Sequence, residues 1–131
     1  MWRFLIIVGL IAGLAGVARA AEPAWQSCRG AIGPDGPVLR DCRPLAGSID
    51  PQGRELWIRT SVPAPPDDRP LALHVYGIAS SEAWLNGRHL GTNGQPGATV
   101  MSEVPGRYQA SLPIGETVWR TGTNELVVRL S

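Results

Sequence analysis

Four side chains in the second half of the chain could bind a small polar ligand. Trp84 offers an aromatic plane and Asn93 offers an amide. His89 and Arg107 add side chains rich in nitrogen donors. An aromatic ring can stack on a sugar ring, while amide and guanidinium groups hydrogen-bond to hydroxyl or carboxylate oxygens. These four residues therefore predict a binding site for a neutral polyol or a small carboxylate.

Each of these residues also has a structural role open to it. Trp84, like Trp57 earlier in the chain, can pack beneath loops, because large aromatic side chains are usually buried. Arg107 can anchor the nearby Glu103, and the glycine-rich residues 91–97 can simply connect two strands. The sequence leaves both the binding and the structural interpretation open.

No arrangement of residues in the sequence predicts catalysis. Asp67 and Asp68 are adjacent acids in a proline-rich segment, where the expected role is a solvated loop charge. Glu55, Glu82 and Glu103 would suit glycoside hydrolysis only if folding placed two carboxylates roughly 5 to 9 Å apart. Motifs for a nucleophilic serine and for a phosphate-binding glycine loop are missing from the sequence. We predict no catalytic residue and no cofactor, and the chain itself is not expected to be an enzyme.

The two cysteines, Cys28 and Cys42, are the only ones in the sequence. An even pair in an exported chain predicts a disulfide. Closing a loop of about 15 residues would stabilise the fold by roughly 3 kcal/mol in the chain-entropy model. A metal pair is the alternative, but there is no C-x-x-C spacing, and His74 and His89 are distant in sequence. We therefore predict no metal site.

The first 20 residues have the pattern of a secretory signal peptide. Arg3 lies in a short charged region, residues 4–17 are apolar, and residues 18–20 form an A-x-A cleavage site. The apolar run has roughly 14 residues, too few for the ~20 of a membrane-spanning helix. An uncleaved N-terminal anchor is the alternative. We expect export to the periplasmic side of a bacterial inner membrane.

The charge of the exported part is close to neutral. All twelve basic residues are arginine, and cleavage after Ala20 leaves ten of them against eleven acidic residues, a net charge of −1. Nucleic-acid binding calls for a basic face, which this composition does not supply. Nucleic acid is therefore excluded as an expected partner.

Short alternating segments predict an antiparallel β-sandwich over residues 51–131. Apolar and polar residues alternate over residues 54–62, 71–76, 82–91, 108–112 and 126–130, and turn residues separate these segments. Asn86-Gly87 is a strong hairpin signal, because both residues tolerate the positive φ of a type I′ turn. Residues 115–121 are expected to hold one helical turn. Residues 21–50 are expected to be loop-rich, with the disulfide and one short strand near Val38.

The order of these motifs from Arg54 onward resembles the galactose-binding-like jelly roll. Its best-known example is the sugar-binding domain of family 2 glycoside hydrolases. The matching motifs are LWIR at 56–59, VP at 62–63, AWLNG at 83–87, LG at 90–91, and G-x-N at 122–124 followed by LVV at 126–128. This resemblance implies a jelly-roll fold and a non-catalytic, sugar-binding role.

The chain also resembles the N-terminal periplasmic region of bacterial membrane-bound sensor histidine kinases. The motifs are DCRPL at 41–45, WLNG at 84–87, LGTNG at 90–94, PG at 96–97 and EVPGR at 103–107. The resemblance implies a parent protein with membrane helices and a kinase core after residue 131. This sequence has no phospho-acceptor histidine motif and no ATP-binding glycine boxes, so the implied kinase activity belongs to the parent.

We therefore expect a non-catalytic periplasmic module of a two-component signalling protein. Its partner would be a small ligand, either a sugar or a small acid, or a periplasmic protein. A segment after residue 131 would join it to the membrane if the chain is a fragment. The alternatives are an accessory carbohydrate-binding domain of a secreted glycoside hydrolase and a free-standing periplasmic structural domain.

Overall fold

A computed structural model describes residues 24–77 and 79–131, and it confirms the predicted antiparallel β-sandwich. The predicted signal peptide at residues 1–20 lies outside the described residues. The elements are β1 (Gln26–Gly33), β2 (Gly36–Pro44), β3 (Leu56–Pro63), β4 (Leu71–Tyr76), β5 (Ser81–Leu85), β6 (Arg88–Asn93), the 3₁₀ turn η1 (Val100–Ser102), β7 (Gln109–Ile114), the 3₁₀ turn η2 (Glu116–Val118) and β8 (Thr123–Leu130). A search of the described residues for a helix long and apolar enough to cross a membrane finds none.

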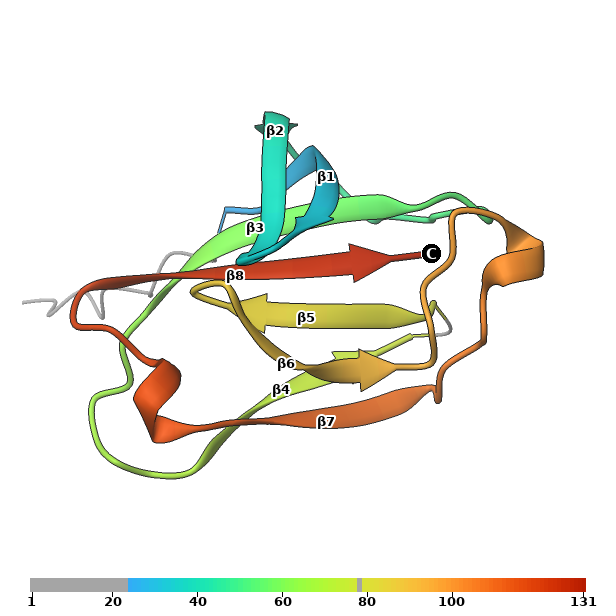
Figure 1. Cartoon of the computed structure of the whole chain (residues 1–131). Helices are drawn as coiled ribbons and strands as arrows, with labels where there is room; N and C mark the ends of the chain where they lie inside the picture. Colours follow the sequence, from blue (N-terminus) through green and yellow to red (C-terminus); the bar gives the residue numbers. More distant parts are fainter. Residues whose placement is uncertain (1–23, 78) are drawn as a thin grey trace, which may run out of the picture.

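The strands form two antiparallel sheets that enclose the main core. The large sheet has the order β2-β1-β3-β8-β5-β6, and β4 and β7 form the small one (Figure 1). The period-two alternation seen in the sequence turns one face of each strand inward. The buried side chains of this core are Ile58, Ala83, Leu85, Leu112, Leu126 and Val128. Leu73 and Val75 of β4 pack against them, so the small sheet closes the core on its second side.

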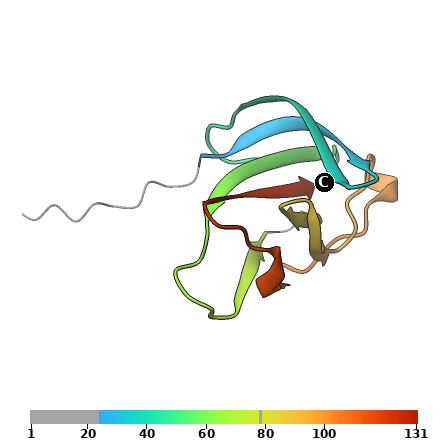
Figure 2. The same cartoon turned by 60° about the vertical axis from the view of Figure 1, so that its left-hand side comes forward.

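Residues 26–44 form a β-hairpin, which corrects the expectation of a loop-rich segment over residues 21–50. β1 pairs with β2, and its first three residues, 26–28, also pair with β3. The hairpin then curls over the outer face of the large sheet (Figure 2). Since β1 belongs to the same sheet as β3, the expected boundary at residue 50 does not separate two domains.

The hairpin covers two tryptophans on that outer face. Trp57 and Trp84 are only 3% and 4% exposed, and their rings stack with centroids 5.6 Å apart. Cys28 and Leu39 of the hairpin pack against them. Gly30 allows this close approach, because a Cβ at that position would lie 2.5 Å from Cγ of Trp57. The structure therefore has a second apolar cluster, outside the sandwich and beneath the hairpin.

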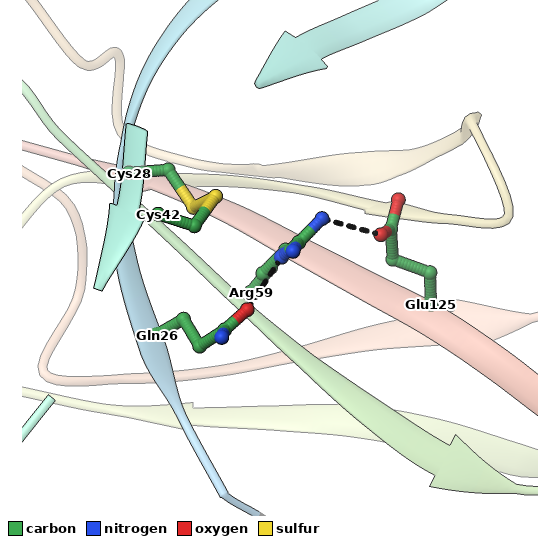
Figure 3. Close-up of a disulfide and its surroundings, with 5 residues drawn as sticks. All are labelled: Gln26, Cys28, Cys42, Arg59 and Glu125. Atoms are coloured by element: carbon green, nitrogen blue, oxygen red, sulfur yellow. Dashed lines mark hydrogen bonds and ion pairs between the residues drawn. A yellow bond between two sulfur atoms is a disulfide. The ribbon is translucent and has the colours of Figure 1, made fainter. Parts of the chain in front are cut away.

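The predicted disulfide joins Cys28 of β1 to Cys42 of β2 (Figure 3). The pairing register of the two strands shifts between Ser27 and Arg29, so the disulfide crosses a bulge. Asp41 occupies the extra position of that bulge with a φ of 53°, a left-handed conformation that aspartate tolerates. A disulfide is also the kind of crosslink that persists in exported proteins.

The predicted turn at Asn86-Gly87 is confirmed. The two residues have φ values of 51° and 79°, as a type I′ turn requires. Trp84 and His89 face each other across the ladder, and so do Leu85 and Arg88. Gly36, at the tip of the covering hairpin, lies so close to this turn that a Cβ on it would be 2.6 Å from the Gly87 carbonyl oxygen.

Replacing Gly30 by alanine is expected to destabilise the protein by about 1–3 kcal/mol, because overpacking must displace either the Trp57 ring or the hairpin. Urea unfolding would measure the loss. Gly115→Ala is the matched control: its φ is −66° and the nearest atom to a new Cβ would be 3.9 Å away. Equal stabilities for the two variants would contradict the packing of the hairpin on Trp57.

The double variant Cys28→Ser/Cys42→Ser is expected to lose about 3 kcal/mol of unfolding free energy, since the disulfide joins residues 14 apart in sequence. A reducing agent should destabilise the wild-type protein by a similar amount and leave the double variant unchanged. Two titratable thiols in the unreduced, denatured wild-type protein would contradict the disulfide.

Candidate functional site

The four residues predicted to bind a ligand lie in two separate places. Trp84 and His89 form a cross-strand pair of β5 and β6, one pair away from the Asn86-Gly87 turn. Asn93 and Arg107 lie together at the end of the sandwich, where β6 leads into the loop of residues 94–107. The structure therefore does not bring the four side chains into one site.

Trp84 does not offer the free aromatic plane that the binding hypothesis requires. Its indole is buried, with the Trp57 ring stacked on it and the His89 ring at 5.5 Å in an edge-on arrangement. Trp84 and Trp57 are packed beneath another segment of the chain, which is the structural role that the sequence also allowed. Alternation along the strand gave the correct face for these rings, but it did not show that the hairpin covers that face.

His89 belongs to a chain of polar contacts that runs beside the covered tryptophans. Its Nε2 lies 3.0 Å from Oε1 of Glu82, whose other oxygen lies 3.4 Å from Nη1 of Arg129. Nη2 of Arg129 contacts Glu55 at 2.8 Å, and Glu55 also accepts a hydrogen bond from Trp57 Nε1 at 2.8 Å. Glu55 and Glu82 thus share one guanidinium group. This arrangement holds both carboxylates as ion-pair partners across the sheet and does not resemble a general acid paired with a base.

Asn93 uses its amide to hold the loop that follows β6. It is 4% exposed, donates a hydrogen bond to the Arg107 carbonyl at 2.7 Å and accepts one from the Arg107 N–H at 2.8 Å. Gly106 lets the amide approach, since a Cβ there would lie 2.7 Å from Asn93 Cγ. Both amide atoms of Asn93 therefore hold the loop, and its role as a ligand contact stays a prediction.

Arg107 is exposed and does not anchor Glu103, which accepts a hydrogen bond from Ser80 Oγ at 3.2 Å instead. Among the described residues, the Arg107 guanidinium has no ion-pair partner. Arg107 and Asn93 line an open depression of about 480 Å³ beside the start of β7. Of the four predicted residues, Arg107 is the one whose charged group remains available.

A cleft at the other end of the sandwich combines an aromatic ring with charges of both signs. The β3–β4 connection and the segment between β7 and β8 lie at the end of the sandwich away from η1 (Figure 1). Their residues line an open cleft of about 380 Å³. The lining residues are Ala64, Pro65, Pro66, Asp67, Asp68, Arg69, Ile114, Glu116, Trp119, Arg120 and Thr121. Trp119 is half-buried and packs against the main core. This volume lies within the range of small-molecule sites.

Some charged side chains of this cleft form an ion pair with each other, and others remain available to a ligand. Arg69 Nε lies 2.8 Å from Oδ2 of Asp67, and the Arg69 N–H donates to Oδ1 at 3.2 Å. The Arg69 side chain, and then its backbone N–H, lower the pKa of Asp67, so that carboxylate stays ionised. Asp68, Glu116 and Arg120 are exposed and form no ion pair with any residue in the described ranges.

Two buried amides position the segment that carries Trp119. Asn124 is fully buried, and its Oδ1 accepts hydrogen bonds at 2.7 Å from both the Arg120 N–H and Asn86 Nδ2. Nδ2 of Asn124 donates to the Arg120 carbonyl at 3.0 Å, and Nδ2 of Asn86 donates to the Val118 carbonyl at 2.9 Å. The β5–β6 turn and the segment before β8 are therefore joined through side chains that bracket Trp119.

Neither Trp119 nor the cleft is predictable from the sequence patterns. Residues 115–121 predict only a helical turn, which the structure places at η2, and the expected role of Asp67-Asp68 is a solvated loop charge. The signal in the sequence was the residue types: a tryptophan next to an arginine at 119–120, and a charged turn at 67–69. Only the topology shows that these two segments lie side by side.

The sequence matches no protein-family model and no curated protein, and the structure matches no solved structure. The fold class therefore rests on the observed strand pairing, and a functional assignment must rest on the geometry of the sites described above.

Asn124→Ala is expected to destabilise the protein by about 2–4 kcal/mol, because it removes a fully buried amide and leaves the partly buried backbone groups of residue 120 without their partners. Thermal or urea unfolding would measure the change. Thr123→Ala, at an exposed neighbouring position, should stay within about 0.5 kcal/mol of the wild type. A similarly small effect of Asn124→Ala would mean that the amide pair does not hold this segment.

Proposed function

We propose that this chain is a non-catalytic ligand-binding module of an exported signalling protein, and that the Trp119 cleft receives the ligand. One observation carries this proposal. A half-buried indole borders a cleft whose rim contains the exposed side chains of Asp68, Glu116 and Arg120, none of which is ion-paired within the described ranges. An apolar surface with a few polar groups at its edge is the usual construction of a small-molecule site.

The chemistry of the cleft favours a sugar or a small acid. The Trp119 ring can supply apolar contact to a sugar ring, and carboxylates can accept hydrogen bonds from its hydroxyl groups. Arg120 supplies a planar set of donors that also suits a carboxylate ligand. The two ligand classes differ in which charged partner they need, so they can be separated by substitution.

An exported chain would be consistent both with a sensor module of a membrane kinase and with an accessory domain of a secreted enzyme. The Cys28–Cys42 disulfide is compatible with a periplasmic or extracellular location. The resemblance of residues 41–107 to periplasmic sensor regions favours an input module of a membrane kinase. An accessory carbohydrate-binding domain of a secreted glycoside hydrolase is the second candidate, because a tryptophan beside carboxylates suits that role equally well.

A thermal-shift screen against sugars, polyols and small carboxylates would test the cleft. A true ligand at about 100 times its Kd should stabilise the wild type by roughly 2.7 kcal/mol, and Trp119→Ala should abolish that shift. Tyr108→Ala is the control, since it removes a 71%-exposed ring at the other end of the molecule. Hits that persist in Trp119→Ala, or the absence of any hit, would count against the proposal.

Two further variants would then identify the ligand class. An acidic ligand should lose affinity in Arg120→Gln and keep it in Asp68→Asn. A neutral sugar that hydrogen-bonds to the carboxylate should show the opposite pattern. Titration calorimetry on the hit from the screen would measure both.

A further inference from the structure

Exposed apolar side chains are concentrated at the end of the sandwich opposite the Trp119 cleft. Of the eight large apolar side chains that are exposed in the described residues, five lie at this end: Tyr76, Val100, Met101, Val104 and Tyr108. Met101 is 94% exposed at the turn η1, which projects from this end (Figure 1). A concentration of exposed apolar residues on one surface of a soluble domain usually marks an interaction site.

A well-ordered loop presents the side chains at its tip. The Gln95 N–H donates to the Val104 carbonyl at 2.8 Å, and the Val104 N–H donates back at 2.9 Å. The loop is also tied to the end of β8, because the Gly97 N–H donates to Ser131 Oγ at 3.0 Å. Gly53 makes room for Val100, since a Cβ at position 53 would lie 2.5 Å from Val100 Cγ2.

Neither apolar cluster of the fold uses these tip residues. Val100, Met101 and Val104 belong to neither the main core nor the cluster beneath the hairpin. Several hydrogen bonds therefore order a loop whose apolar side chains are exposed to water. Packing in the two apolar clusters does not explain why these side chains are apolar.

The surroundings of the tip match the chemistry of a lipid headgroup layer. Tyr76 and Tyr108 are 65% and 71% exposed, and tyrosine is enriched at membrane–water interfaces because its ring has an apolar body and a polar end. Arg54 and Arg107 are exposed near the tip, and neither has an ion-pair partner among residues that the structure describes. Both are free to contact lipid phosphates.

The acidic groups at this end are engaged within the protein. Asp50 Oδ1 accepts a hydrogen bond from the Gln52 N–H at 3.0 Å, and Glu103 Oε1 accepts one from Ser80 Oγ at 3.2 Å. Among the described side chains near the tip, those without such a contact are apolar, phenolic or cationic. An anionic phospholipid surface offers the complementary acyl and phosphate groups.

We infer that the η1 loop docks on the surface of an anionic phospholipid bilayer, with Met101 and its neighbouring valines inserted at the level of the headgroups and Arg54 and Arg107 on the phosphates. A few inserted side chains give weak, reversible binding unless a second attachment supports them. This inference is independent of the Trp119 cleft, so either can fail without the other.

A fluorescent probe at the tip tests the inference directly. Met101→Cys is labelled with NBD without reduction, since no free cysteine is present in the described chain. Vesicles of phosphatidylethanolamine and phosphatidylglycerol should shift the NBD emission to the blue. The matched control is Ile32→Cys, an apolar residue that is 54% exposed on the covering hairpin, and its probe should not shift. The probe reports on the loop alone, whatever residues 1–20 contribute to vesicle binding.

Co-sedimentation with the same vesicles gives the second measurement. At high salt, where surface charge is screened, Met101→Asp should still bind about tenfold less than Ile32→Asp, because an inserted charge is costly. Protein that sediments while the probe at 101 stays in water would overturn the inference, and so would the absence of any blue shift of that probe at high lipid concentration. A blue shift that rises with protein concentration and needs no vesicles would assign the patch to a second copy of the chain instead.

Discussion

The amide pair Asn86–Asn124 is the constraint on which the end of the molecule that carries the Trp119 cleft depends. These two side chains are 38 residues apart, and their 2.7 Å hydrogen bond joins the β5–β6 turn to the segment before β8. Each also binds partly buried backbone groups of that segment, which would otherwise lose these partners. The position of Trp119 follows from this pair, because the backbone groups on both sides of it are held.

A second constraint acts on the outer face of the large sheet. Trp57 and Trp84 are too large to leave in water, and the sandwich interior lies on the other side of their strands. The hairpin of β1 and β2 solves this by covering them, with Gly30 providing the necessary clearance and the disulfide fixing the bulge beside it. Arg129 then pairs with both carboxylates at the edge of the covered region, since unpaired charges there would be destabilising.

Local sequence patterns predicted the local features of the fold, such as strands, a turn and a disulfide. They could not predict which distant segments pack against one another. Alternation gave the strands of the sandwich, Asn86-Gly87 gave its turn, and two cysteines gave the disulfide. The hairpin was missed because its glycines and prolines are typical of loops, whereas here glycine permits contact with an indole. The sequence left both a binding and a packing role open for Trp84, since alternation assigns a side chain to a face but does not say what covers that face. Trp119 lies in a segment without periodicity, where spatial neighbours are invisible in the sequence.

The two proposed surfaces lie at opposite ends of the same strands, and this separation has a mechanical consequence. Eight residues of β8, at about 3.3 Å each, span roughly 26 Å between the Asn124 region and Ser131. A molecule resting on lipid through η1 would therefore hold the Trp119 cleft well away from the bilayer and open to solutes. The strands between the ends are paired along their length and bury the main core, so a ligand at the cleft would act on loops carried by a rigid body. Any signal would then have to be a change in the orientation of the whole domain relative to the membrane or a partner, because the closely packed sandwich has little freedom to deform.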